Sequence, residues 1–578
     1  PTSPPITLVA VFFPIVFMEG MTGRLFREFS IVISGSVIIS SFAALTFTPM
    51  LATKLLVKRE KQNWFYLKTE PFFEGMNRLY SRSLAGFLHK RWIALPFVAI
   101  TIGIIAFLWN YIPAEMAPLE DRSQISINTM GAEGVTYEYI RDYTEDINHL
   151  VDSIIPDAET LTARVSSGSG NVRITLKDMK DRDYTQMDVA EKLSAAVQKK
   201  TMARSFVQQS SSFGGRRGGM PVQYVLQATN IEKLQEVLPK FMAKVYENPV
   251  FQMADVDLKF SKPEARININ RDKASIMGVS TRNIAQTLQY GLSGQRMGYF
   301  YMNGKQYEIL GEINRQQRNT PANLKSIYIR SDKGDMVQLD NLIELTGGIA
   351  PPKLYRYNRF VSATVSAGLA EGKTIGQGLD EMDKIAKETL DDTFRTALTG
   401  DSKEYRESSS SLMFAFILAI VLIYLILAAQ FESFKDPLII MLTVPLAIAG
   451  ALVFMYFGGI TMNIFSQIGI IMLIGLVAKN GILIVEFANL KQETGEDKMT
   501  AIKDAALQRL RPILMTSAST ILGLIPLAFA SGEGCNQRIA MGTAVVGGML
   551  VSTLLTMYIV PAIYSYISTN RSNKLKQE

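Results

Sequence analysis

A single lysine inside an apolar segment constrains this chain more than any other feature. Residues 464–489 are strongly apolar, yet Lys479 stands near their centre. About 20 apolar residues cross a bilayer as a helix. A lysine at the centre of such a helix costs roughly 2.5–3.5 kcal/mol on insertion. A segment that accepts this cost usually hides the charge beside a carboxylate or a water path, which favours an ion or proton relay.

Structural alternatives to a relay remain at this point. Lys479 can snorkel to a headgroup, or the segment can be assigned a few residues out of register. The next cationic residue toward the end of the segment is Lys491, which makes snorkelling difficult. Asn480 follows directly, and Glu486 lies about two helical turns further on. The physical argument therefore favours the relay without excluding a structural lysine.

Further apolar segments predict a bundle of membrane helices, at residues 6–18, 31–53, 92–112, 412–429, 438–457, 512–530 and 539–567. The first is short for a span, and the chain starts within it and without Met, so we expect a fragment whose N-terminal part is missing. The net charge of +7 is interpreted as loop charge that sets membrane topology rather than as nucleic-acid binding. The one cysteine, Cys535, excludes an internal disulfide.

Residues 113–405 contain no apolar segment of this length and predict an α/β region. The first part has the order strand–helix–strand–strand–helix–strand, which is the ferredoxin-like order. The second part repeats that order, split by an insertion from about Arg271 to Lys353. Within the insertion, YFYMNGKQYEI contains an Asn-Gly pair that predicts a hairpin. We infer a duplicated module, one copy of which carries an inserted domain.

Basic residues are concentrated in three links, and they set the expected topology. The 54–91 link, the 491–511 link and the C-terminal tail fall on one side if each span is crossed once, and we place them in the cytoplasm. The α/β region is then outside. The 54–91 link mixes basic and aromatic residues, so a helix on the membrane surface and a solvated linker are equally compatible with it.

Hydroxyl side chains recur in the segment RPILMTSASTILGLIPLAF. Helix packing through interhelical hydrogen bonds explains most of them. Thr516 stands one turn in from Arg511 and can reach a relay on a neighbouring span. Arg509 and Arg511 flank the cytoplasmic end, where anchoring by the positive-inside rule is the alternative role.

The remaining motifs predict no enzyme. The segment SFGGRRGGM at 212–220 lacks the Gly-Lys-Ser/Thr pattern of a phosphate loop and suits a linker between the two modules. The two histidines cannot build a zinc site, and no Ser/His/Asp set is found. The 27 methionines suit soft-metal binding in principle, but most lie in apolar segments where packing explains them.

Four motifs in order resemble the resistance–nodulation–division (RND) efflux permeases, and most closely their hydrophobe/amphiphile, or multidrug, branch. They are FMEGMTGRLFREFS, AAQFESFKDPLIIMLTVPLAIAGA, GLVAKNGILIVEFAN and RLRPILMTSASTILGLIPL. The resemblance covers essentially the whole chain, as the C-terminal half of a permease with its fifth and sixth spans. It implies a proton-driven exporter in the bacterial inner membrane, active as a homotrimer with a periplasmic membrane-fusion adaptor and an outer-membrane channel. No cofactor is implied.

The resemblance also implies site residues and a division of the chain. The lysine of the AKN motif is Lys479, which in the family pairs with acidic residues on a span absent from this chain, assisted by Thr516 and Arg509, with Asn480 adjacent. The expected division is two transmembrane helices in 1–53, the first one truncated; a cytoplasmic connector, 54–91; a transmembrane helix, 92–112; a first porter subdomain, 113–220; a second porter subdomain, 221–270 with 354–402; an inserted docking domain, 271–353; five transmembrane helices, 408–567; and a cytoplasmic tail, 568–578.

One further departure from the family pattern and two alternative functions accompany the resemblance. The link between ETLTARVSSGSG and NVRITLK is short where multidrug members carry a longer loop, so no substrate-binding residue is assigned. A heavy-metal RND exporter is the first alternative; it would require methionine pairs lining the periplasmic cleft. A non-efflux membrane scaffold or export-assisting protein is the second.

Overall fold

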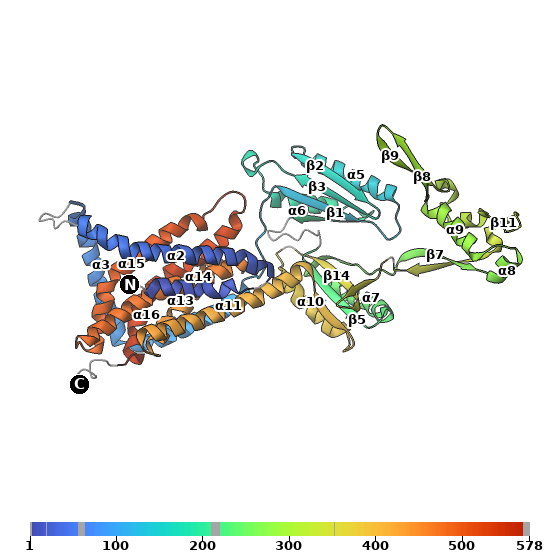
Figure 1. Ribbon diagram of the computed structural model, residues 1–578. Coiled ribbons are helices and arrows are strands. Elements are labelled where there is room, and N and C mark those ends of the chain that lie inside the picture. Colours follow the sequence, from blue (N-terminus) through green and yellow to red (C-terminus); the bar gives the residue numbers. More distant parts are fainter. Residues whose placement is uncertain are drawn as a thin grey trace. The chain divides into compact units, whose positions relative to one another are not determined.

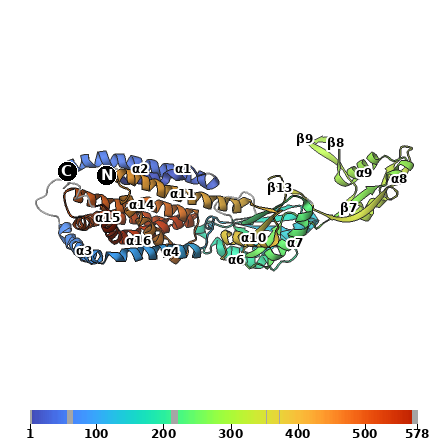
Figure 2. The ribbon, with the colours of Figure 1, turned by 90° about the horizontal axis from the view of Figure 1, so that it is seen from below.

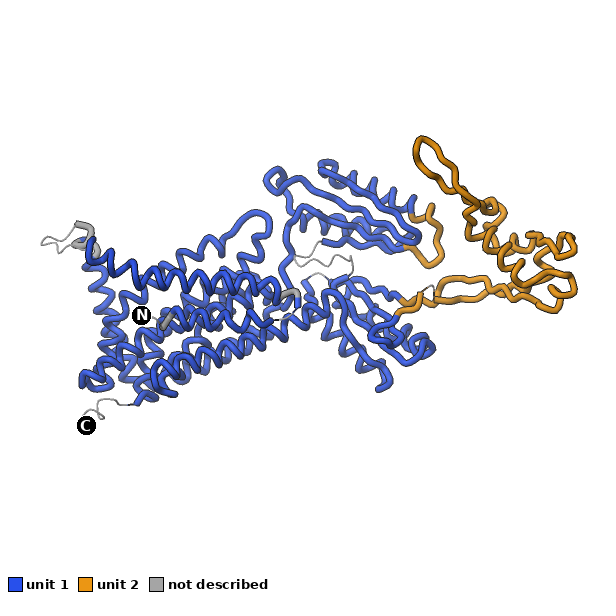
Figure 3. Tube along the Cα trace, in the orientation of Figure 1, with its two compact units in different colours: residues 1–130, 141–257, 356–578 blue, residues 131–140, 258–355 orange. Residues whose placement is uncertain are grey.

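The computed structural model describes residues 3–18, 20–55, 64–209, 220–351, 353–370 and 372–569. The chain divides into two compact units (Figure 3). Unit 1 comprises residues 1–130, 141–257 and 356–578, and unit 2 comprises residues 131–140 and 258–355. The predicted 212–220 linker, except its last residue, and most of the 568–578 tail lie outside the described residues.

The apolar segments of unit 1 form long helices (Figure 1). Apart from the helices that connect the strands of its β-sheets, unit 1 contains α1 Ser3–Val16, α2 Gly20–Leu55, α3 Trp64–His89, α4 Ala94–Tyr111, α11 Gly400–Phe431, α12 Asp436–Met441, α13 Thr443–Phe457, α14 Ile464–Glu493, α15 Lys498–Ala528 and α16 Cys535–Ile567. By length and composition, seven helical stretches among the described residues can cross a membrane, those containing α2, α4, α11, α13, α14, α15 and α16, and α1 is a shorter apolar helix.

Helix α16 packs against α13, α14 and α15. Figure 2 shows α16 beside α14 and α15. Glycines permit this close packing, because small residues let helix backbones approach one another in a membrane. A Cβ on Gly548 of α16 would lie 2.9 Å from the carbonyl oxygen of Ala447 of α13, and one on Gly469 of α14 would lie 3.0 Å from that of Met541. The outward faces of α2 and α11 carry exposed apolar side chains such as Phe42 and Phe414, which suits contact with lipid tails.

The 54–91 link contains helix α3, which packs against α15 and α16. Leu84 is fully buried, and the Tyr80 hydroxyl donates to the Met557 carbonyl at 2.6 Å. The Arg511 guanidinium lies 4.3 Å from the Phe73 ring centroid and 3.4 Å from the Glu70 carboxylate. A helix docked on the bundle is therefore present rather than a free linker, and its place at the membrane surface stays a prediction.

The first β-sheet of unit 1 has the strand order β2-β3-β1-β4, with antiparallel neighbours. Its elements are β1 Gln124–Met130, α5 Tyr137–Ile154, β2 Thr160–Ser166, β3 Ser169–Thr175, α6 Gln186–Val197 and β4 Arg204–Gln209. Alternate residues of β1, Ile125 and Ile127, are buried against Ile147 of α5 and Leu193 of α6. The period of two in the strands and the apolar helix faces thus produce the element order that the sequence predicts.

The second β-sheet of unit 1 repeats this plan from two separate chain segments. Its elements are β5 Val222–Ala228, α7 Ile231–Glu247, β6 Phe251–Val256, β13 Tyr355–Tyr357, β14 Phe360–Leu369, α10 Ile375–Thr389 and β15 Arg395–Leu398. The order β6-β14-β5-β15 matches that of the first sheet strand for strand, since β14 pairs with both β5 and β6 and β15 pairs with β5. Strand β13, beside β14, is an addition that the sequence did not indicate.

Unit 2 has its own sheets and its own core. Its elements are β7 Lys262–Ile269, α8 Arg271–Ile276, α9 Thr281–Ser293, β8 Gln295–Met302, β9 Lys305–Gly311, β10 Tyr328–Arg330, β11 Met336–Gln338 and β12 Ile343–Ala350. Ile284, Leu339 and Leu342 lie at its centre with no exposed surface. The Asn-Gly hairpin is confirmed: β8 and β9 pair, and Asn303 and Gly304 have the positive φ angles, 51° and 73°, that such a turn needs.

Short 3-10 helices complete the element order, at Arg91–Ile93, Met179–Asp181, Arg315–Gln317, Pro321–Ser326 and Leu339–Asn341. The longer segment of unit 2 starts at residue 258, before the predicted insertion of 271–353. Strand β7 pairs with β12 and therefore belongs to the same compact unit. The domain boundaries drawn from the sequence stay predictions.

A separate core in unit 2 has a measurable consequence. Ile284→Ala should destabilise residues 258–355 by about 2–5 kcal/mol, because it leaves a cavity among fully buried neighbours. Hydrogen exchange followed by mass spectrometry should show faster exchange in 258–355 and unchanged exchange in the helices of unit 1. Ile276→Ala, at a side chain that is 83% exposed in the same unit, is the matched control. Equal loss of protection in both units would contradict a separate core.

Candidate functional site

Helix α14 places the lysine inside the helical bundle. Asn463 starts the helix by accepting hydrogen bonds from the backbone of Phe465 and Ser466, both at 3.0 Å, and the Ser466 hydroxyl accepts from the Asn463 backbone in return. Such a reciprocal cap satisfies amides that a helix start leaves free. The apolar residues that follow are buried on several sides, against α13, α16, α1 and α11. Lys479 is partly buried in this setting.

Asn480 joins three helices. Its amide nitrogen lies 3.3 Å from the Ser517 hydroxyl of α15 and 3.4 Å from the Thr553 hydroxyl of α16. All three side chains are nearly inaccessible. Among the described residues, the Asn480 amide oxygen and the buried Thr556 hydroxyl have no hydrogen-bond partner. A polar centre with unused acceptor capacity thus lies beside Lys479, inside an otherwise apolar bundle.

The other predicted site residues lie around this centre without bonding to it. The Thr516 hydroxyl donates to the Ile513 carbonyl of its own helix at 3.1 Å, and the side chain is exposed. The Arg509 guanidinium stacks 4.4 Å from the Phe487 ring centroid of α14. Within the part of the chain that the structure describes, Lys479 has no hydrogen-bond or ion-pair partner. The structure therefore brings Asn480 together with two hydroxyls, but not with Thr516 or Arg509.

Two residues of this centre were not selected from the sequence. Ser517 was grouped with hydroxyls that pack helices, and Thr553 was not considered. Thr553 and Thr556 are buried on one face of α16, three residues apart. Buried hydroxyls at helical spacing, opposite a polar residue of another span, are the signal that could have found them.

A second polar cluster lies toward the other end of α14. The Asn489 amide donates to the fully buried Asp436 carboxylate of α12 at 3.1 Å, and the Tyr564 hydroxyl of α16 donates to Asn489 at 2.5 Å. The Gln492 amide donates to Tyr564 at 2.7 Å. Every member is satisfied by a neighbour, which is what a buried polar network needs to be stabilising. This cluster fixes α12, α14 and α16 to one another.

An inter-sheet cavity of about 640 Å³ lies between the two β-sheets of unit 1. Its walls are α6 and β4 on one side and β6, β14 and α10 on the other, and residues 115–117 also line it. Cavities of this size hold drug-sized ligands. The lining includes the carboxylates Glu115, Asp188, Glu191 and Asp401 against one lysine, Lys373.

Glu115 connects this inter-sheet cavity to the bundle. The Thr461 hydroxyl, in the link between α13 and α14, donates to the Glu115 carboxylate, and the Glu115 amide donates to the Met462 carbonyl at 3.0 Å. Burial raises the pKa of Glu115, and the hydrogen bond from Thr461 opposes that shift. The adjacent Met116 packs against the core of the helical bundle.

This combination of a membrane bundle with an internal lysine and two β-sheets around a cavity defines a membrane transporter of the RND class. The sequence profile of the AcrB/AcrD/AcrF family matches residues 3–568. The chain belongs to this family of RND permeases. A relative from Haemophilus influenzae, called an uncharacterized transporter, is 30% identical over 574 residues, which is 98% of this chain and 56% of that protein. The chain therefore spans about half the length of the curated relative it matches.

Proposed function

We propose that this chain is the C-terminal part of the inner-membrane permease of a tripartite pump, which exports amphiphilic compounds in exchange for protons. The observation that carries the proposal is the polar centre beside Lys479. A lysine there opposes insertion by roughly 2.5–3.5 kcal/mol, and Asn480 next to it is buried with an unused amide oxygen. Structural packing alone needs neither feature.

The proposed relay consists of Lys479, Asn480, Thr516 and Arg509. Its acidic partners, following the family, lie on a span outside this chain. When those carboxylates are ionised, Lys479 pairs with them. When a proton neutralises them, the attraction falls and the lysine turns toward Asn480. Binding or release of one proton then shifts the equilibrium between two arrangements of the helical bundle.

The remaining parts take their roles from the same proposal. The two β-sheets form porter subdomains of ferredoxin-like topology in the periplasm, and the inter-sheet cavity between them lies on the substrate path. Residues 271–353 form the docking domain that meets the adaptor and the outer-membrane channel. The permease works as a homotrimer, with the 54–91 connector and the tail in the cytoplasm. The duplicated strand order of the two sheets supports this division.

The carboxylates of the inter-sheet cavity favour a cationic amphiphile as the substrate. Glu115, Asp188, Glu191 and Asp401 outnumber Lys373, and a cavity lined by one sign of charge raises the local concentration of the opposite charge. The apolar groups beside them suit the hydrocarbon part of such a compound.

A heavy-metal exporter is the second candidate, because one observation favours it. Methionine side chains line the inter-sheet cavity at Met116, Met187, Met220 and Met253. Thioether sulfur is a soft ligand that selects Cu(I) over hard cations. The carboxylates in the same wall are hard ligands, and they favour the first candidate over this one.

Transport by the full-length protein in proteoliposomes tests both candidates. We expect a pH gradient to drive ethidium, a quaternary ammonium, across the membrane and to leave Cu(I) behind. Glu191→Gln should weaken ethidium transport by about 1.5- to 5-fold, the effect of one solvent-screened charge, and leave neutral Nile red unaffected. Cu(I) flux without ethidium flux would identify the second candidate. Absence of both the ethidium and the Cu(I) flux would contradict both candidate functions and leave a scaffold role.

A further inference from the structure

The chain between α4 and β1 is held from two sides. On one side is the first turn of α16, where the Asn536 amide donates to the Leu119 carbonyl at 2.7 Å and the Gln537 backbone amide donates to the Glu120 carboxylate at 2.9 Å. On the other side are α6 and the loop before it. Residues 119–124, the connecting segment, therefore join a bundle helix to the first β-sheet.

Glu120 acts as the N-terminal cap of α16. The residue at the cap position is Gly534, which has no side chain to accept a hydrogen bond. A helix start leaves backbone amides free and carries a partial positive charge, so a carboxylate there is favourable on both counts. Glu120 supplies that carboxylate from another part of the chain and is 1% exposed.

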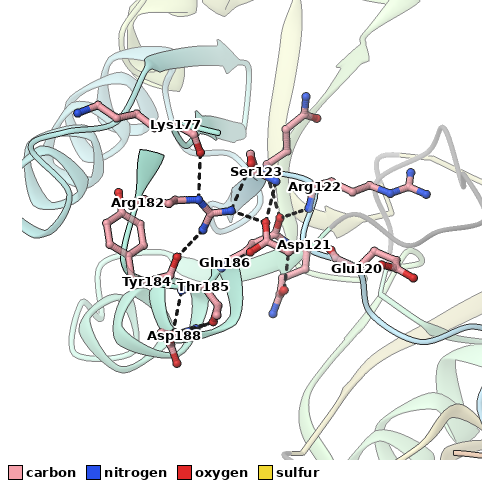
Figure 4. A network of polar contacts seen from close by, with 12 residues as sticks. Glu120, Asp121, Arg122, Ser123, Lys177, Arg182, Tyr184, Thr185, Gln186 and Asp188 are labelled. Carbon is pink, nitrogen blue, oxygen red and sulfur yellow. Dashed lines mark hydrogen bonds and ion pairs between the residues drawn. The ribbon is translucent and has the colours of Figure 1, made fainter. Parts of the chain in front are cut away.

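Asp121 makes the opposite connection, to α6 (Figure 4). Its carboxylate accepts from the Gln186 backbone amide at 2.8 Å and from the Arg182 guanidinium at 2.5 Å. The Arg182 side chain is fully buried and that of Asp121 is 10% exposed. Gln186, the first residue of α6, returns the contact by accepting from the backbone amides of Arg122 and Gln124 at 2.9 and 3.1 Å.

Both ends of this connection lead to parts with proposed roles. Helix α16 carries Thr553, which contacts Asn480 in the polar centre. Helix α6 carries Met187, Asp188 and Glu191 in the wall of the inter-sheet cavity. A path thus runs from the polar centre along α16 and then, through the charge-assisted contacts of Glu120 and Asp121, to the cavity wall.

We propose that Glu120 and Asp121 are positioning residues that transmit a displacement of α16 to α6 and so change the inter-sheet cavity. The proposal rests on the proposed transport function. Such contacts transmit movement well because buried, charge-assisted hydrogen bonds are short and have few alternative geometries, whereas an apolar contact can slide. Packed interfaces change between discrete arrangements, so a small shift at α16 is enough to reorient α6.

The alternative role of these residues is purely structural. Loss of a structural contact would lower stability in the resting and the energised protein alike. Loss of a transmitting contact would remove the difference between those two states. The decisive quantity is therefore the change in cavity accessibility when a proton gradient is applied.

The test uses the full-length transporter in proteoliposomes, with Cys535→Ser to remove the thiol in α16. Ser194→Cys, on α6 in the cavity wall, reports accessibility through its rate of alkylation by a maleimide. In the parent, we expect a pH gradient to change that rate. Glu120→Gln and Asp121→Asn should reduce both this change and ethidium turnover by about 2- to 30-fold, the range of coupling changes produced by single residues. Ethidium binding without a gradient should be unaffected.

Matched variants keep the test decisive. Thr129→Val removes the buried hydrogen bond to Ser205 in the same sheet and leaves the hydrogen bonds of Glu120 and Asp121 in place, so it should retain the gradient-dependent change. Asn536→Ala removes the bond to the Leu119 carbonyl, together with a contact to the neighbouring residue 535, keeps the Glu120 and Asp121 carboxylates, and should reduce the change partially. It decides the question even if the Glu120 variant fails to fold.

The outcomes separate the two proposals. A parent that exports no ethidium contradicts the proposed function. A parent that exports ethidium while Ser194→Cys reacts equally with and without a gradient overturns the inference alone. Retention of the full gradient-dependent change in Glu120→Gln, Asp121→Asn or, where these do not accumulate, Asn536→Ala also overturns it.

Discussion

On the proposed proton relay, Lys479→Met in the full-length transporter should reduce gradient-driven export by about a hundredfold or more, the scale on which positioned proton-transfer groups contribute. Methionine keeps the length and the apolar stem but removes the ammonium group. Insertion and folding should be retained, because replacing a partly buried charge by an apolar side chain relieves its desolvation. Drug accumulation in cells with equal membrane levels of each variant is the measurement.

Two further variants separate a relay from a packing role. Lys479→Arg should also fail, since a planar guanidinium does not reproduce a compact ammonium. Lys491→Met is the matched control in the same helix, because it removes a partly exposed ion pair to Glu496 at 2.6 Å, and solvent-screened pairs of this kind contribute little to stability. Near-normal export by Lys479→Met would show that the lysine is structural.

Gly542→Val should disrupt the contact between α15 and α16. A Cβ at Gly542 would lie 2.5 Å from the Ala528 nitrogen and 2.7 Å from the Leu527 carbonyl carbon. Both are backbone atoms, so a helix has to move rather than a side chain. Overpacking of this kind costs about 1–3 kcal/mol, and we expect a lower thermal unfolding temperature of the purified protein in detergent.

The control for this prediction is a glycine in α15 with open space around it. A Cβ at Gly523 meets nothing within 4 Å among the described residues. Gly523→Ala should therefore leave the unfolding temperature unchanged or raise it, because alanine favours a helix by up to about 1 kcal/mol over glycine. An unfolding temperature for Gly542→Val equal to that of Gly523→Ala would show that α15 and α16 separate without cost.

The sequence predicted the local elements well, because their causes are local. The apolar run of 464–489 became α14, and alternating strands became two sheets of equal strand order. The Asn-Gly pair became the turn between β8 and β9. The family was also recognisable, since its motifs are contiguous stretches of chain.

The contacts between distant elements came only from the tertiary structure. Thr516 and Ser517 are adjacent, so they lie about 100° apart around a helix, and only packing decided that Ser517 meets Asn480. Glu120 caps α16 by accepting a hydrogen bond from the backbone amide of Gln537, which lies 417 positions further along the chain.

The sequence by itself determined which segments are helices, which are strands, and which apolar helix contains a charged residue. These properties follow from side-chain periodicity and apolar length, which act within one element. It left open which face of each helix meets which neighbour. That choice depends on the shapes of surfaces assembled from the whole chain. The joining of Asn480 to Thr553, and of Asp121 to Arg182, was therefore decided by the tertiary structure.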